Sequence, residues 1–432
     1  MSSYRFYGGK ILTMEEPLAV FEGEVWTKDD RIIFAGDIDS AKKLMGEKSP
    51  VFDREIDASG KLLMPGFKNA HTHSAMVFLR SMADDLPLDK WLNTQVFPRE
   101  AKLDEEMIYH LTKLAILEYL TSGVTGVFEM YLTPESIAAA FEDMGMRCVQ
   151  TGSLNDFSQS VQLLDDMCEE LNRPDSLNSF IPGFHAEYTC SKGLLEEVAA
   201  LAKRRKTPIW CHNSETLSEV RGCEERYGMS PTQLLDSLGI YDFGGGGYHC
   251  VYLSDEDIEI FKKRGLSIVT NPASNAKLAS GIAPLSKYKD AGINIAIGTD
   301  GPASNNCLDM FREMFLATAL AKLRQKDASA CDATDVLIWA TKGGSKAMGF
   351  SDCDILAPGK KADLIMLDLM QPNMQPENNI IKNIVYSGSK QNVSMTMING
   401  EIKYMNGEFF VGEDVGRIYE KAEQITASLR IL

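Results

Sequence analysis

The sequence predicts an α/β fold, namely a (β/α)8 barrel of the TIM type with a small β-sandwich domain that both termini build. The chain has 432 residues, which is too many for one ordinary domain and suits a barrel of about 250 residues with a smaller unit beside it. Through the middle of the chain, apolar runs alternate with helical, charged runs, which is the pattern of parallel strands with crossover helices. The two ends instead contain short strand-like runs and tight turns.

The ends of the chain predict the small domain. The run 31–36 is rich in strand-forming residues, and 362–368 and 394–398 repeat this character near the C-terminus. Asn-Gly pairs lie at 399–400 and 406–407, and Asn-Gly between strand-like runs is the strongest short signal of a β-hairpin. Because both ends of the chain share this pattern of short strands and turns and the middle does not, we expect the two ends to form a single small domain.

Eight apolar runs in the middle of the chain predict the barrel strands. They are residues 62–67, 124–130, 147–153, 180–185, 208–212, 247–251, 266–271 and 293–300. Helical stretches lie between them, among them 104–120, 194–204 and 231–238. We therefore expect the catalytic barrel at residues 61–356 and the small domain at residues 1–60 and 357–432, with a surface helix at its end. The glycines 244–247 lack the Lys-Ser/Thr of a phosphate-binding loop, so we expect a plain loop there.

The positions of the six histidines are informative, because five of them fall at the ends of predicted strands, where a (β/α)8 barrel has its active site. The polar residues at these ends are His71 and His73 after strand one, His185 after strand four, His212 after strand five, His249 after strand six and Asp300 after strand eight. Each alone is explained by a half-buried histidine or, for Asp300, by a helix cap. Together they predict a metal site, because a divalent ion needs three or four such ligands. His110 lies within a predicted helix, and we expect it to be structural.

The residue types restrict the metal. Histidine nitrogens with one carboxylate suit zinc or iron, whereas magnesium and calcium prefer oxygen ligands. We expect one divalent transition metal, with zinc as the first choice and iron as the alternative. Glu215 follows His212 by three residues, so its carboxylate can reach a water that the metal activates. The structural alternative for Glu215 is a capping glutamate in the next helix.

The composition excludes several classes of partner. The net charge of −17 argues against nucleic acid and against an anionic membrane surface. No run of about 18 apolar residues could span a bilayer, and the N-terminus lacks an apolar signal segment. Nine cysteines without a C-x-x-C pair indicate reduced thiols and a cytoplasmic protein. We expect a small-molecule substrate and a homo-oligomer.

Six segments of the chain match a known family, and they occur in the same order. They are PGFKNAHTH (65–73), ADDLPL (83–88), HNSET (212–216), NPASNAKLASG (271–281), GTDGPASNN (298–306) and GKKADL (359–364). With these segments the chain resembles the amidohydrolase superfamily, and within it the 5′-methylthioadenosine/S-adenosylhomocysteine deaminase group. The resemblance covers nearly the whole chain.

The resemblance implies roles for individual residues. The ligands of one metal ion would be His71, His73, His212 and Asp300. Glu215 would be the proton shuttle, His249 would hydrogen-bond the attacking water, and Asp300 would pass a proton to the departing ammonia. Glu100 and His185 would contact the ribose of a nucleoside. The structural alternatives are a surface glutamate for Glu100 and a barrel-rim histidine for His185.

The implied reaction is metal-dependent hydrolytic deamination of an adenosine-type nucleoside to the inosine analogue and ammonia. The substrate would belong to the 5′-methylthioadenosine, 5′-deoxyadenosine or S-adenosylhomocysteine class. Deaminases or chlorohydrolases of guanine, pterin or triazine are alternatives on the same scaffold. A two-metal cyclic-amide hydrolase would need a bridging lysine after strand four, where this chain has His185.

The segment 148–172, after strand three, bears on the 5′ group of the substrate. Members of the group that handle S-adenosylhomocysteine are expected to carry arginines there, because the planar guanidinium pairs with a carboxylate through two hydrogen bonds. This segment contains no Arg or Lys and instead has Asp156, Asp165, Asp166, Glu169 and Glu170. We therefore expect a preference for adenosines with a small neutral 5′ group.

Overall fold

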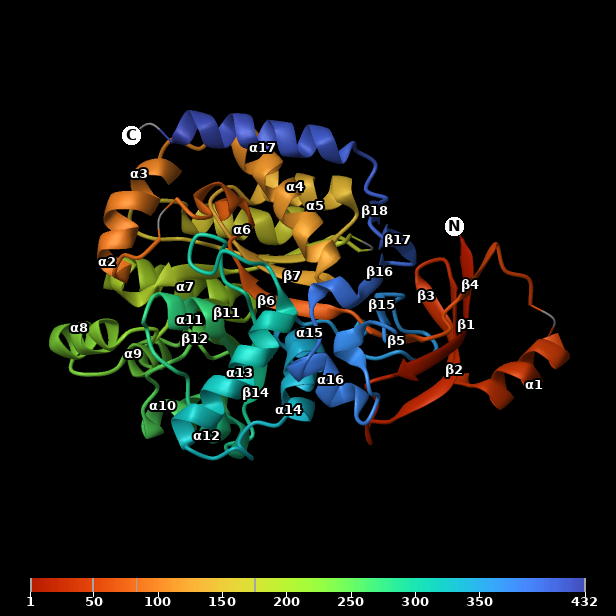
Figure 1. The fold of residues 1–432 in the computed structure, drawn as a ribbon. Coiled ribbons are helices and arrows are strands. Elements are labelled where there is room, and N and C mark those ends of the chain that lie inside the picture. The colour runs from red at the N-terminus through yellow and green to blue at the C-terminus, as the bar shows by residue number, and fades with distance from the viewer. Residues whose placement is uncertain (1, 49, 83, 175, 431–432) are drawn as a thin grey trace.

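The computed structural model describes residues 2–48, 50–82, 84–174 and 176–430. Its larger part is the predicted barrel, with helices around a ring of parallel strands (Figure 1). Four strands pair in one run: β6 (Phe67–Thr72), β7 (Val124–Met130), β8 (Arg147–Thr151) and β9 (Asn178–Ile181). Five pair in the other: β10 (Gly183–Ala186), β11 (Ile209–Asn213), β12 (Gly245–His249), β13 (Ser267–Thr270) and β14 (Asn294–Ile297).

The two runs join into one closed barrel. β9 and β10 lie end to end in one strand position of the barrel. The ladder is interrupted between them at Pro182, because proline has no backbone N–H to donate to a neighbouring strand. On the opposite side β14 lies beside β6. There the Asp300 amide donates to the His71 carbonyl at 2.9 Å, and the Thr299 amide donates to Asn69 Oδ1 at 2.9 Å. The barrel thus has eight strand positions, as predicted, although the residues of the first strand differ from the prediction.

The first barrel strand differs from the prediction. The predicted strand at 62–67 is instead largely β5 (Lys61–Pro65), which pairs with β1 (Ser3–Leu12) and β15 (Leu364–Asp368) in the sheet of the termini. The chain crosses to the barrel at Gly66, where Thr125 leaves no room for a side chain. The first barrel strand is therefore β6, and His71 lies within it rather than after it. We propose that the small domain ends at this crossing and not at residue 60.

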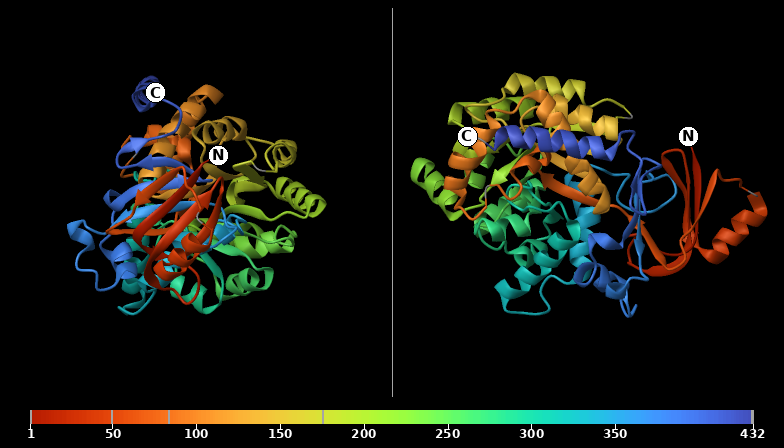
Figure 2. Two further views of the ribbon diagram at one scale, coloured as in Figure 1. Left: turned by 90° about the vertical axis from the view of Figure 1, so that its right-hand side faces the viewer. Right: turned by 45° about the horizontal axis from the view of Figure 1, so that its top comes forward.

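The termini build one continuous mixed sheet of nine strands, shown in red and blue in Figure 2. Its order is β18-β17-β16-β15-β5-β1-β2-β3, with β4 beside β1. The strands not yet given are β2 (Val20–Lys28), β3 (Arg31–Asp37), β4 (Arg54–Asp57), β16 (Val393–Ile398), β17 (Glu401–Met405) and β18 (Glu408–Phe409). Side chains from both termini share one apolar core, including Phe6, Ile11, Leu63, Met366 and Met395. The termini therefore form one mixed sheet in place of the two packed sheets of the predicted sandwich.

Both Asn-Gly turns of this sheet are confirmed. Asn399 and Gly400 connect β16 to β17 with φ of 52° and 78°, and Asn406 and Gly407 connect β17 to β18 with φ of 49° and 91°. Positive φ at both central residues matches the right-handed twist of the two strands, which explains the choice of Asn and Gly.

The helices cover the outside of the barrel. The principal ones are α4 (Glu105–Thr121), α5 (Pro134–Met144), α6 (Val161–Glu170), α7 (Lys192–Arg205), α8 (Leu217–Tyr227), α9 (Pro231–Ser237), α10 (Asp255–Arg264), α11 (Pro272–Lys277), α12 (Leu285–Asp290), α13 (Met310–Gln325), α14 (Ala333–Ile338) and α16 (Ile380–Tyr386). The predicted helices at 104–120, 194–204 and 231–238 correspond to α4, α7 and α9. The C-terminal helix α17 (Val415–Leu429) lies against α4 of the barrel rather than on the terminal sheet (Figures 1 and 2).

The glycine run 244–247 is not a loop as predicted. Gly245, Gly246 and Gly247 form the start of β12. A Cβ on Gly246 would lie 2.4 Å from the indole ring of Trp210, whose side chain fills the barrel interior. The glycines are therefore needed for close packing inside the barrel. Within the described ranges of the chain, no helix is both long and apolar enough to cross a membrane.

Candidate active site

Side chains from four barrel strands or the turns after them meet at one end of the barrel. His71 lies in β6 and His73 directly after it, while His212 and His249 lie at the ends of β11 and β12. Asp300 follows β14, and its amide is held by the His71 carbonyl. The structure thus brings together all five residues, as the barrel topology predicted.

His71 lies at the centre of this cluster. The ligating atoms of His71, His73 and His212 lie within 4.8 Å of one another, and those of His71, His249 and Asp300 do so as well. Asp300 Oδ1 is 3.6 Å from His71 Nε2 and 3.3 Å from His73 Nε2. Below the cluster, the ring of Tyr248 stacks on His71 with centroids 3.8 Å apart. One cation could contact several of these ligating atoms at once.

The buried polar atoms of the cluster fit a metal ion. His71 has no exposed surface, and neither of its ring nitrogens has a hydrogen-bond partner among the described residues. A buried polar atom without a partner is costly unless a ligand satisfies it. Burial holds the pKa of both His71 and His212 well below the usual histidine value. Both imidazoles are therefore neutral, which is the form that binds metal.

The surrounding hydrogen bonds orient the other ligands. Nδ1 of His212 donates to the carbonyl of His185 at 2.7 Å, and Nδ1 of His73 is paired with the carbonyl of Met130. Both rings therefore present Nε2 to the cluster. Such partners fix the tautomer and the orientation of a metal-ligating histidine.

Asp300 is held from several sides. Its Oδ2 accepts hydrogen bonds from Ser274 Oγ at 2.5 Å and Ser304 Oγ at 2.7 Å, and its Oδ1 accepts one from the Gly301 amide at 2.7 Å. Its φ of 60° lies in the left-handed region, which costs energy for a residue with a side chain. These contacts hold Oδ1 toward His71 and His73. No pattern in the sequence predicts this role for the two serines, although they lie in the family-like segments 271–281 and 298–306.

Glu215 and His249 face each other beside the cluster. Glu215 follows β11 and is 7% exposed, and its Oε1 accepts a hydrogen bond from Ser280 Oγ at 2.9 Å. Its Oε2 lies 3.8 Å from His249 Nε2, while His249 Nδ1 is paired with Asn275 Oδ1 at 2.7 Å. A carboxylate held in this way can take up and release a proton next to the ligand cluster.

A pocket of about 520 Å³ opens above these residues and reaches the rim of the barrel. Polar residues of the cluster, with Glu215, form one end of it. The remainder is largely apolar, with Met76, Trp91, Leu92, Val96, Phe97, Leu132, Phe157, Tyr188 and Leu278 among its lining residues. A pocket with one reactive end and an apolar remainder suits a flat, mostly uncharged ligand.

Glu100 and His185 both line this pocket, as predicted. Glu100 Oε1, the Tyr131 hydroxyl and Trp91 Nε1 are buried without a hydrogen bond of good geometry among the described residues. Burial raises the pKa of the Glu100 carboxyl, while the neighbouring Tyr131 hydroxyl acts in the opposite direction. Burial lowers the pKa of His185 to about 4, so that its imidazole is neutral. A ligand with hydroxyl groups could form hydrogen bonds with these buried atoms of Glu100, Tyr131 and Trp91.

The sequence also matches a known family of enzymes. The profile of the amidohydrolase family matches residues 62–403, which span the barrel and part of the terminal sheet. The chain belongs to the amidohydrolase family. The predicted class of enzyme, a metal-dependent amidohydrolase, and the predicted barrel are thereby confirmed.

Named relatives of this amidohydrolase cover most of its length. A protein of Methanothermobacter thermautotrophicus named 5′-deoxyadenosine deaminase is 38% identical over 87% of this chain and 90% of its own. A protein of Pelotomaculum thermopropionicum named 5-methylthioadenosine/S-adenosylhomocysteine deaminase is 38% identical over 93% of each chain. Among solved structures, an adenosine deaminase from Xanthomonas campestris with bound zinc is 33% identical, covers 99% of each chain and has a TM-score of 0.93.

The sixth histidine of this amidohydrolase lies outside the cluster. His110 is on α4, partly exposed, with its Nε2 3.8 Å from Glu106. It does not line the pocket. Its position is that of a surface histidine, as the sequence predicted.

Proposed function

We propose that this amidohydrolase removes the amino group of an adenosine-type nucleoside by hydrolysis, giving the inosine analogue and ammonia. The observation that carries the proposal is the pair of Glu215 and His249 facing the ligand cluster at the closed end of the pocket. The names of the relatives at 38% identity support the adenosine branch over the guanine, pterin and triazine branches.

We propose one zinc ion per chain, bound by His71, His73, His212 and Asp300. The unpartnered nitrogens of His71 and the oriented Nε2 atoms of His73 and His212 support this set. A zinc ion held by these residues would lower the pKa of a bound water to about 7 and so supply a nucleophile at neutral pH. Bound zinc in the Xanthomonas campestris structure supports zinc over iron.

The protein residues would then move the protons. Water adds its oxygen to the ring carbon that bears the amino group, and Glu215 takes one proton from that water and gives it to the adjacent ring nitrogen. Asp300 accepts the second proton and passes it to the amino group as the carbon–nitrogen bond breaks and ammonia leaves. His249 lies beside Glu215, where it can hydrogen-bond the attacking oxygen. Proton transfers of this kind each contribute about 10²–10⁴-fold in rate.

The pocket supports a nucleoside in one orientation. The reactive ring lies against the cluster, and the sugar lies toward Glu100 and His185, where buried polar atoms lack partners. A carboxylate such as Glu100 can accept hydrogen bonds from both hydroxyls of a ribose. The apolar remainder of the pocket is then left for the 5′ group.

The charges around the 5′ end support a neutral substituent. Among the described residues, no Lys or Arg lines the pocket. The five acidic residues of the segment 148–172 would not repel a carboxylate there, because none of them lines the pocket. Asp165 and Glu169 pair instead with Arg205 on the outside of the barrel. What disfavours a charged 5′ group is therefore the missing partner and not repulsion.

We predict that kcat/KM for 5′-methylthioadenosine and 5′-deoxyadenosine exceeds kcat/KM for S-adenosylhomocysteine by about 10–150-fold. The reason is that a charged hydrogen-bonded pair is worth about 1.5–3 kcal/mol, and this pocket offers none to the homocysteine carboxylate. The measurement is ammonia release for the three nucleosides under one set of conditions, with guanine, a pterin and a triazine in the same panel.

Phe157 offers a matched test of the reason. It lines the pocket mouth and is 95% exposed, so Phe157→Arg adds a guanidinium without burying it. We expect this variant to raise kcat/KM for S-adenosylhomocysteine up to about tenfold relative to the neutral substrates. A wild-type enzyme that prefers S-adenosylhomocysteine would refute the predicted selectivity.

A further inference from the structure

Glu219, in the first turn of α8, makes contacts that reach back toward the active site. Its side chain is buried, with 6% exposure. Oε1 accepts a hydrogen bond from the Ser214 amide and Oε2 accepts one from the Glu215 amide, each at 2.8 Å. One carboxylate thus satisfies two successive backbone N–H groups, and the second of these belongs to Glu215.

These contacts exceed what a helix cap requires. Thr216 Oγ1 accepts from the Glu219 amide at 3.2 Å, which is half of a capping box. In the full capping box, the glutamate would return to the amide of the capping residue itself, here Thr216. Glu219 instead passes Thr216 and bonds to the two residues before it. The hydrogen bond to Ser214 therefore adds nothing to the capping of α8 itself.

The turn that Glu219 holds is conformationally unusual. Ser214 has a φ of 52°, in the left-handed region that residues with a side chain seldom adopt. Its carbonyl accepts from the amides of Val251 and Tyr252, each at 3.0 Å. The turn is thus held at its carbonyl by the loop after β12 and at its amide by Glu219. This turn sets the direction in which Glu215 leaves β11.

We propose that Glu219 is the positioning residue for Glu215. Its two oxygens fix the Ser214 and Glu215 amides, so that the Glu215 carboxylate stays between Ser280 and His249. This inference rests on the proposed role of Glu215 as proton shuttle. A displacement of about 1 Å in a reacting group can cost about 100-fold in rate, so loss of one of the two contacts has a measurable effect.

The test is a double-mutant cycle of wild type, Glu219→Gln, Glu215→Gln and the double variant, with zinc-loaded protein and saturating substrate. Glutamine keeps the shape but turns one acceptor oxygen into an NH2 group that cannot accept from a backbone N–H. We expect Glu219→Gln to lower kcat about 10–100-fold, with KM within about threefold and bound zinc unchanged. In the Glu215→Gln background the same change should have no further effect on kcat, because Glu219 acts through Glu215.

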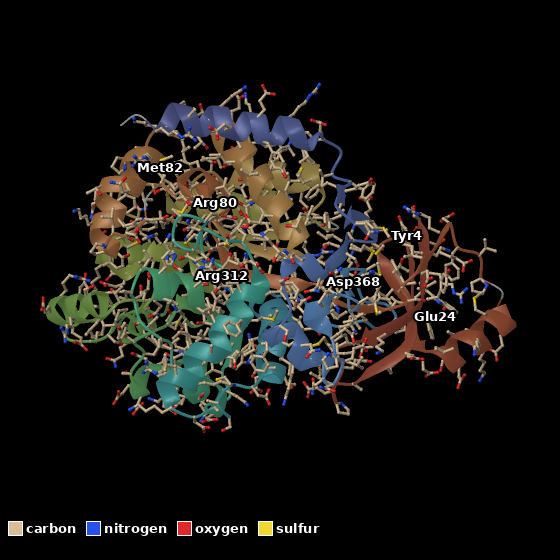
Figure 3. All side chains as sticks on the ribbon, viewed as in Figure 1. Tyr4, Glu24, Arg80, Met82, Arg312 and Asp368 are labelled. Carbon is tan, nitrogen blue, oxygen red and sulfur yellow. The ribbon has the colours of Figure 1, made fainter. Side chains whose placement is uncertain are left out.

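Glu24→Gln is the matched control. Glu24 is likewise buried, with 6% exposure, and its carboxylate bonds Arg5 and Trp26 in the terminal sheet, away from the barrel (Figure 3). We expect it to lower the melting temperature and to leave kcat unchanged. If Glu219→Gln does not fold, Glu219→Asp, whose shorter side chain cannot span both amides, takes its place in the cycle.

The outcomes distinguish failure of the positioning role from failure of the proposed function. A folded Glu219 variant with wild-type kcat overturns the positioning role, as does an equal loss of kcat in both backgrounds, which would indicate a general structural effect. If Glu215→Gln itself retains wild-type turnover, the proposed function of Glu215 fails instead. If the wild type acts only on another amino-heterocycle, the same cycle is measured with that substrate.

Discussion

Glu215→Gln is expected to lower kcat at least about 100-fold while the variant keeps its fold and its metal. Glutamine has the shape of glutamate but cannot exchange a proton, and removal of a general acid and base typically costs about 10²–10⁴-fold. Two of the proposed ligands are oriented without Glu215, since His212 is held by the His185 carbonyl and Asp300 by Ser274 and Ser304. The measurements are kcat by ammonia release and zinc content by elemental analysis.

Glu225→Gln is the control for this substitution. Glu225 is exposed on α8, close in sequence but outside the pocket. It should have the kcat of the wild type. A Glu215→Gln variant that deaminates at nearly the wild-type rate with its zinc in place would show that another group moves the proton.

Removal of the metal by a chelator is expected to abolish turnover, to below about 1% of the wild-type rate. Without zinc, the pKa of water stays far above neutral pH, so water supplies almost no hydroxide. Addition of one equivalent of zinc per chain should restore the rate. We expect this stoichiometry because, among the described residues, the groups that could hold a metal ion all share His71, and because His185 rather than a lysine lies at the end of the fourth strand.

Histidine variants provide the matched comparison for the metal. His71→Ala removes the residue common to both groups of ligating atoms and should bind no zinc. His110→Ala removes a histidine on α4, outside the pocket, and should bind one equivalent and keep full activity. Two equivalents of zinc, both needed for activity, would contradict the single-metal site.

The barrel and its site were predictable from the sequence because the topology imposes them. Parallel strands with crossover helices all end on one face, so residues as distant as His71, His212 and Asp300 had to meet there. Glu100 was predictable only through the resemblance to a family. It lies in α3 (Phe97–Glu100), outside the strand-end pattern, and no periodicity in the sequence directs it to the pocket.

What the sequence did not predict depends on contacts between distant residues. The strand at 62–67 was assigned to the barrel because apolar periodicity does not reveal pairing partners, and only the pairing with β1 and β15 places it in the terminal sheet. The sequence predicts a loop for the glycines 244–247 because it does not show that the indole of Trp210 fills the side-chain space at Gly246. The spacing of Thr216 and Glu219 predicts a capping box, but the direction of the Glu219 carboxylate follows from the left-handed turn at Ser214.

Hydrolytic deamination of an adenosine-type nucleoside can be tested directly by incubating 5′-methylthioadenosine with the zinc-loaded enzyme in heavy-oxygen water. We expect equimolar ammonia and an inosine analogue that carries one heavy oxygen at the carbon that lost the amino group. The claim is contradicted if no adenosine in the panel releases ammonia while the same preparation hydrolyses guanine, a pterin or a triazine.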